Sequence, residues 1–122
     1  MSTMKQDAER EHRIEMEIVV DAYGEEERAM GWHVYLDDNL RFPFKGRCIV
    51  ERRTSPLRVG ETVRVEEMAP EDDCMQEMFV IVEWSGRKLG VPLAQLEGVG
   101  VDDETRQAIE DWHYWVAQGH EF

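Results

Sequence analysis

Residues 78–91 read Met-Phe-Val-Ile-Val-Glu-Trp-Ser-Gly-Arg-Lys-Leu-Gly-Val, and they carry the strongest structural signal in the chain. The first seven are almost all apolar, β-branched or aromatic, which is typical of a buried strand. Ser85-Gly86 is a two-residue turn signal, and the five residues that follow are long enough for a return strand. The stretch therefore predicts an antiparallel β-hairpin.

Weaker strand signals flank this hairpin on both sides. They occupy residues 44–53, 62–68 and 97–101. Residues 92–96 predict a single helical turn directly before the last of these strands. Four to five short antiparallel strands with a helical turn before the last one predict a small SH3-like β-barrel over residues 42–101.

Helical periodicity brackets the predicted barrel at both ends. Residues 6–40 contain two amphipathic stripes separated by Gly24, so we expect a helical pair in which this glycine ends the first helix. Residues 102–118 place apolar side chains on one face of a helix, with Asp102 or Asp103 as its N-cap. The expected fold class is therefore α+β, with helices flanking an antiparallel barrel in a single domain of 122 residues.

Aromatic residues recur at helical spacing in both helical regions. Trp32 and Tyr35 are three residues apart, as are Trp112 and Trp115, so each pair shares one helix face. We expect these faces to pack against each other and to cover the barrel. The alternative is a groove for a partner protein, because Trp and Tyr are enriched at interface hot spots.

The chain is strongly acidic, and its charge is unevenly distributed. It has 27 Asp and Glu against 14 Lys and Arg, which gives a net charge of −13. Residues 61–83 carry eight acids and one base, whereas residues 41–58 carry six bases and one acid. This balance argues against nucleic acid and anionic lipid as partners, because both are bound through Lys and Arg. It permits a cation or a basic protein segment, and it is equally compatible with high solubility alone.

The sequence contains no sign of secretion or membrane insertion. Residues 1–13 lack the apolar core of a signal peptide, and the apolar runs are far shorter than the ~20 residues of a membrane helix. Cys48 and Cys74 form no CxxC motif and fit two free thiols in a reducing compartment, with a disulfide between them left open. We therefore expect a cytoplasmic protein.

Catalytic motifs are absent from the sequence. There is no GxSxG, P-loop or GxGxxG pattern, and the four histidines and two cysteines do not have the spacing of zinc ligands. Nothing singles out a catalytic pair among the 27 acidic residues. We expect a protein that is not an enzyme.

Two acidic segments are the candidate metal sites, one at the end of the second helix and one in the longest loop between strands. They comprise Asp37, Asp38, Glu71, Asp72, Asp73 and Glu77. A calcium ion takes about six to eight oxygen ligands, which loops supply well because their carbonyl groups are free. Neither segment has the EF-hand spacing, since the glycine at its sixth position is missing. A calcium site would therefore combine different segments and keep several waters.

Several short runs resemble the CcbP family of calcium-binding proteins, and together they span residues 11–122. The runs are Asp21-Ala-Tyr-Gly24, Ala29-Met-Gly-Trp32, Leu40-Arg-Phe-Pro-Phe44, Ser55-Pro-Leu57, Met68-Ala-Pro-Glu71 and Glu110-Asp-Trp-His-Tyr-Trp115. The resemblance implies a cytoplasmic protein that sequesters calcium at sites on an acidic surface that are not EF-hands. This acidic character coincides with the two segments above, so their six carboxylates are the predicted ligands.

Two hypotheses follow from the sequence. The leading one is a non-enzymatic cytoplasmic calcium buffer or sequestering protein that uses surface carboxylate clusters, in which a divalent ion relieves the repulsion between neighbouring carboxylates. The alternative is an acidic interaction module, an SH3-like barrel that holds a basic protein segment and has no specific metal site.

Overall fold

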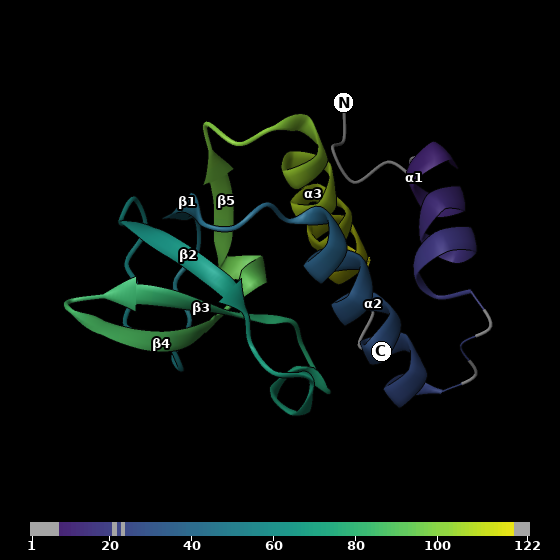
Figure 1. The fold of residues 1–122 in the computed structure, drawn as a ribbon, viewed down its shortest axis with the longest axis horizontal. Helices are drawn as coiled ribbons and strands as arrows, with labels where there is room; N and C mark the ends of the chain where they lie inside the picture. Colours follow the sequence, from purple (N-terminus) through teal and green to yellow (C-terminus); the bar gives the residue numbers. More distant parts are fainter. Residues whose placement is uncertain (1–7, 21, 23, 119–122) are drawn as a thin grey trace.

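The computed structural model describes residues 8–20, 22 and 24–118 of the chain. A twisted antiparallel sheet lies on one side of the molecule, and the helices lie on the other (Figure 1). In chain order the elements are α1 (Ala8–Arg13), the π-helical η1 (Ile14–Ile18), α2 (Glu25–Asn39), β1 (Phe44–Cys48), β2 (Thr62–Met68), the 3₁₀-helix η2 (Glu71–Cys74), β3 (Phe79–Trp84), β4 (Arg87–Pro92), the 3₁₀-helix η3 (Leu93–Gln95), β5 (Leu96–Val99) and α3 (Asp103–Ala117).

The sheet has five antiparallel strands in the order β4-β3-β2-β1-β5. The α+β class is therefore confirmed, but the closed SH3-like barrel that the sequence predicted is not formed. In the described sheet, β4 and β5 are the two edges and do not pair with each other. Strand β5 instead contacts α3, which also packs against η3.

The hairpin predicted over residues 78–91 is present as β3 and β4. Ser85 and Gly86 connect the strands with φ angles of 53° and 79°, the left-handed conformation that a type I′ turn requires. The prediction for 62–68 matches β2, and the predicted turn before the last strand is η3. The strand predicted over 44–53 is shorter, because β1 ends at Cys48.

The helical regions match the sequence prediction in part. The first predicted helix is divided into α1 and η1, and its residues 6 and 7 lie outside the described part of the chain. Gly24 was expected to end this helix but is instead the N-cap of α2. At α3 the expected cap is confirmed, because the Asp102 carboxylate accepts a hydrogen bond of 2.8 Å from the amide of Thr105.

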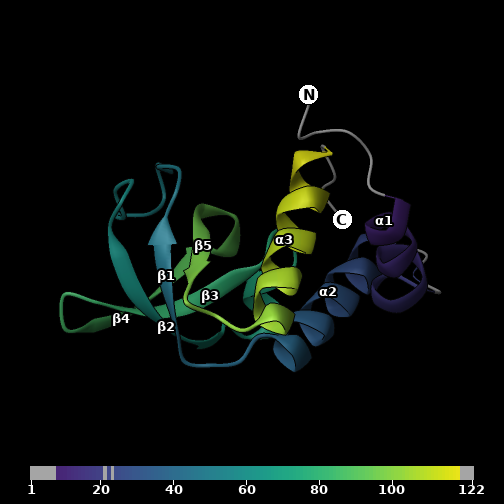
Figure 2. The same cartoon turned by 90° about the horizontal axis from the view of Figure 1, so that it is seen from above.

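The core lies between the inner face of the sheet and the pair α2 and α3, which run beside each other (Figure 2). The ring of Trp32, fully buried, lies 5.0 Å from that of Trp112 and 5.6 Å from that of Trp115, measured between centroids. The expectation that the aromatic faces pack against each other is therefore confirmed. Cys48 and Cys74 are both buried and free.

The segment η1 crosses α2 at very close range. A Cβ atom at Gly31 would overlap the carbonyl oxygen of Ile18, so this crossing requires a residue without a side chain. Among the described residues, no helix has the length and apolar character needed to cross a membrane.

Candidate metal-binding surface

Many of the acidic side chains are neutralised by arginines from other elements. Glu77, one of the six predicted ligands, accepts hydrogen bonds of 2.8 and 2.9 Å from the Arg52 guanidinium with its two oxygens. The basic segment 41–58, which looks separate from the acids in the sequence, supplies two further ion pairs of this kind. They are Arg41–Asp102 and Arg47–Glu97. The charge segregation seen along the chain is therefore reduced in space.

Asp37 and Asp38 lie in the last turn of α2, and both are exposed. Within the described residues, neither carboxylate has a hydrogen bond or an ion pair, and the last turn of α2 contains no basic residue. The C-terminal end of a helix is already negative, because its last carbonyl groups have no partner in the helix. Two carboxylates at this position increase the negative potential, and a bound cation would relieve it.

Further oxygen atoms lie next to this pair. The side-chain amide of Asn39 donates a 2.8 Å hydrogen bond to the carbonyl of Tyr35, and its own oxygen takes no part in that bond. Asp38 and Asn39 line a groove of about 440 Å³ to which η1 contributes Glu17 and α3 contributes Gln107. These four side chains offer carboxylate and amide oxygens as metal ligands, and such ligands suit a hard cation such as calcium better than a soft metal.

The second predicted segment is a short 3₁₀-helix rather than an open loop. Glu71, Asp72 and Asp73 form the exposed side of η2, and in the described structure their carboxylates have no hydrogen bond or ion pair. Cys74 anchors η2 to the core, because its buried sulfur accepts a hydrogen bond of 3.4 Å from the amide of Phe79. These three carboxylates therefore remain available to a ligand on a surface that the core holds in place.

The structure does not bring the two acidic segments together. Among the described residues, no group of three or more His, Cys, Asp or Glu is arranged to hold a metal ion. Asp37 and Asp38 belong to the end of α2 that leads into β1, whereas η2 connects β2 to β3 and lies level with the other half of α2 (Figure 1). Any ion bound at either segment would complete its ligand shell with backbone carbonyls and water.

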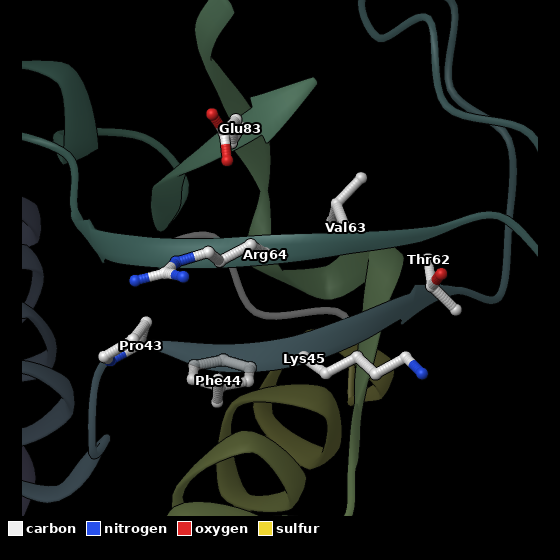
Figure 3. Close-up of a pocket in the computed structure, with 7 residues that line it drawn as sticks. All are labelled: Pro43, Phe44, Lys45, Thr62, Val63, Arg64 and Glu83. Atoms are coloured by element: carbon white, nitrogen blue, oxygen red, sulfur yellow. The ribbon is translucent and has the colours of Figure 1, made fainter. Parts of the chain in front are cut away.

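A pocket on the outer face of the sheet has a different character. Its volume is about 490 Å³, and two of its lining residues, Lys45 on β1 and Arg64 on β2, are paired in the strand register. Their side chains extend toward opposite ends of the pocket, with Glu83 on the neighbouring strand (Figure 3). The rest of the lining consists of Pro43, Phe44, Thr62 and Val63. Two cations against one carboxylate make this pocket unsuitable for calcium.

Sequence reasoning missed Asp111, an acidic residue with several hydrogen-bond partners. It is fully buried, and its carboxylate accepts hydrogen bonds of 2.7 and 2.9 Å from Arg13 and one of 2.7 Å from the Tyr35 hydroxyl. These bonds raise the pKa of Arg13, while burial and the bond to Asp111 raise the pKa of Tyr35. The sequence did contain a signal that Asp111 is buried, because this residue lies between Ile109 and Trp112 on the predicted apolar face of the C-terminal helix.

The fold and this surface together define a small acidic α+β protein with partnerless carboxylates that offer oxygen ligands to a hard cation. A family model for CcbP, described as calcium binding, matches residues 12–116. The chain belongs to this CcbP family of calcium-binding proteins, and the resemblance seen in the sequence is thereby confirmed.

Two solved structures are similar over 100% of both chains. The crystal structure of Anabaena CcbP is 46% identical in sequence, with a TM-score of 0.87. A calcium-binding protein in its calcium-binding form is 45% identical, also with a TM-score of 0.87. No curated protein matches the chain.

Proposed function

We propose that this protein is a non-enzymatic cytoplasmic calcium buffer that binds Ca²⁺ reversibly through surface carboxylates. Asp37 and Asp38 at the end of α2 are the primary ligands. The 3₁₀-helix η2 supplies a second, weaker site through Glu71, Asp72 and Asp73. The membership of the CcbP family and the similarity to a protein in its calcium-binding form support calcium as the ion.

The environment of Asp37 and Asp38 is the observation that carries the proposal. Both side chains are exposed at the negative end of a helix, with no partner within the described residues and no basic residue in the same turn. Such an arrangement costs about 0.3–1 kcal/mol per charge in the absence of a cation. A divalent ion removes this cost and gains carboxylate and carbonyl oxygens as ligands.

Glu77 has a different role in this proposal, although the sequence predicted it as a ligand. Arg52 binds both of its oxygens, and the two side chains are only partly exposed. Calcium would have to displace a bidentate arginine to reach this carboxylate. We therefore assign Glu77 to the anchoring of the segment that follows η2 and not to the ligand set.

The test is calcium calorimetry on a double variant, Asp37→Asn with Asp38→Asn. We expect the variant to lose the stronger binding event, while Glu83→Gln, which removes an exposed carboxylate on β3, leaves the titration unchanged. In the absence of calcium the double variant should be more stable than the wild type, because it relieves the charge at the helix end. Glu104→Gln, by contrast, should make the protein less stable, because Glu104 lies in the first turn of α3, where a negative charge is favourable.

Two results would contradict the proposal. The first is a wild-type protein that shows no heat and no melting shift up to millimolar calcium. The second is an unchanged calcium affinity and stoichiometry in both the Asp37/Asp38 variant and a matching variant of η2, Asp72→Asn with Asp73→Asn.

A further inference from the structure

An exposed stripe along α2 combines apolar and acidic side chains. Met30 and Val34 are 44% and 52% exposed, although they lie four residues apart on one face of a helix whose other face is in the core. Glu26 precedes them by one turn and Asp38 follows them by one turn, so the face reads acid, Met, Val, acid at a spacing of four. Both carboxylates are exposed.

This stripe borders the groove between η1 and α2. Met30, Val34 and Asp38 form one wall of the groove, and Glu17 and Ile18 of η1 form part of the other. The close approach of η1 at Gly31 fixes the position of the two walls relative to each other. The result is a preformed apolar strip with carboxylates at its ends and on its rim.

The charges on the rim indicate the chemistry of a partner. In the described structure, Glu17 and Asp38 of the groove have no hydrogen bond or ion pair, nor has Glu26 at the end of the stripe, whereas the one cation that lines the groove, Arg13, is bound by the buried Asp111. The groove therefore presents uncompensated negative charge around exposed methionine and valine. Methionine adapts to varied apolar surfaces, and helices that bind in grooves place apolar anchors at i, i+3, i+4 and i+7.

We propose that this face of α2 is a docking site for a basic amphipathic helix of another protein. Glu26 and Asp38 are 12 positions apart in α2, a rise of about 18 Å. A fitting partner carries Lys or Arg residues about three turns apart, on either side of an apolar stripe. Its apolar side chains cover Met30 and Val34, and its cations pair with the carboxylates at the two ends.

The test uses a labelled amphipathic leucine–lysine helical peptide, titrated with the protein and followed by fluorescence anisotropy. The buffer contains a chelator, so the result does not depend on the calcium site proposed above, which calorimetry tests separately. We expect the peptide to bind with an affinity that falls as salt is added. A peptide of the same composition in scrambled order, without an apolar face, should bind at least tenfold more weakly.

Matched variants locate the site. Met30→Gln with Val34→Thr should weaken binding at least tenfold, and Glu26→Gln with Asp38→Asn about tenfold, with a flatter salt dependence. The controls remove the same kinds of group elsewhere: Val59→Thr, at a position 61% exposed, and Glu83→Gln. Circular dichroism checks that each variant is folded.

Three outcomes would overturn the proposal. They are the absence of peptide binding below millimolar concentration, equal affinity for the scrambled peptide, and an equal loss of affinity in the control variants and the groove variants.

Discussion

At the scale of single residues, Asp111 shows what a buried charge requires in this fold. Its carboxylate is inaccessible to solvent, so it depends on partners from the protein. It accepts hydrogen bonds from Arg13 in α1 and Tyr35 in α2, and it forms an ion pair with Arg10, whose Nε lies 3.2 Å from an oxygen of Asp111. A buried carboxylate without such donors would cost several kcal/mol. One residue thus connects three helices.

Replacement of this residue tests that role. Asp111→Ala removes the carboxylate that binds Arg13, an ion-pair partner of Arg10 and the acceptor of the Tyr35 hydroxyl. We expect the free energy of unfolding in urea to fall by about 2–3 kcal/mol. Glu110→Gln, which alters an exposed acid on the same helix, should change it by no more than about 0.5 kcal/mol. Equal effects of the two variants would contradict the assignment.

His113 provides a prediction of pH dependence. Burial lowers its pKa from the ordinary value of 6.5, and the carbonyl groups of Leu93 and Leu96 offset this only in part. Because the folded pKa lies below the unfolded one, the unfolded state binds the proton first, and stability falls as the pH drops below about 6.5. In urea unfolding between pH 5 and 8, His113→Gln should flatten this dependence, whereas His12→Gln, at an exposed position, should retain it.

At the scale of elements, local patterns predicted the hairpin β3–β4, the strand β2 and the helix α3, because each depends on neighbours within a few residues. The π-helical geometry of η1 and the role of Gly24 as an N-cap were not predicted. The packing of η1 across α2, which brings the Ile18 carbonyl close to Gly31, was not predicted either. Sequence periodicity contains no information about such a crossing.

This crossing leads to a prediction for Gly31→Ala. Alanine normally favours a helix over glycine by about 1 kcal/mol, but here its Cβ would overlap a backbone oxygen of η1. We expect a net loss of about 1–3 kcal/mol in the free energy of unfolding, since neither backbone segment can move freely. Gly90→Ala on β4, where the nearest atom would be 3.9 Å away, is the control and should be nearly neutral. A stabilised Gly31→Ala variant would show that η1 does not pack as described.

At the scale of the whole molecule, the net charge of −13 destabilises the folded state through repulsion between like charges, and bound cations should reduce this repulsion. We expect calcium to raise the melting temperature more than magnesium at equal concentration, because exposed carboxylates do not impose the octahedral geometry that magnesium demands. At about 100 times its dissociation constant, calcium should stabilise the protein by about 2.7 kcal/mol. Sodium chloride at matched ionic strength controls for screening. Identical shifts with all three salts would exclude a specific site.

The candidate site could be predicted only in part. The six carboxylates were identifiable as acidic segments, and five of them are exposed and without partners within the described residues. Glu77 differs because Arg52, 25 positions earlier in the chain, binds it. In the sequence, the bases of residues 41–58 are also separate from the acids, whereas three arginines of this segment form ion pairs with acids from other elements in the structure.

The sequence alone was sufficient for the features that depend on near neighbours: the hairpin, the capped C-terminal helix, the acidic composition and the family. The sequence was not sufficient to tell which charged side chains are paired within the protein and which are exposed without a partner. The partners Arg13 and Asp111 are 98 positions apart, yet their atoms are 2.7 Å apart in the folded chain. Electrostatic interactions depend on distance in space and on exposure to water. Only the tertiary structure therefore separates the carboxylates that are bound within the protein from those that are free to bind a cation.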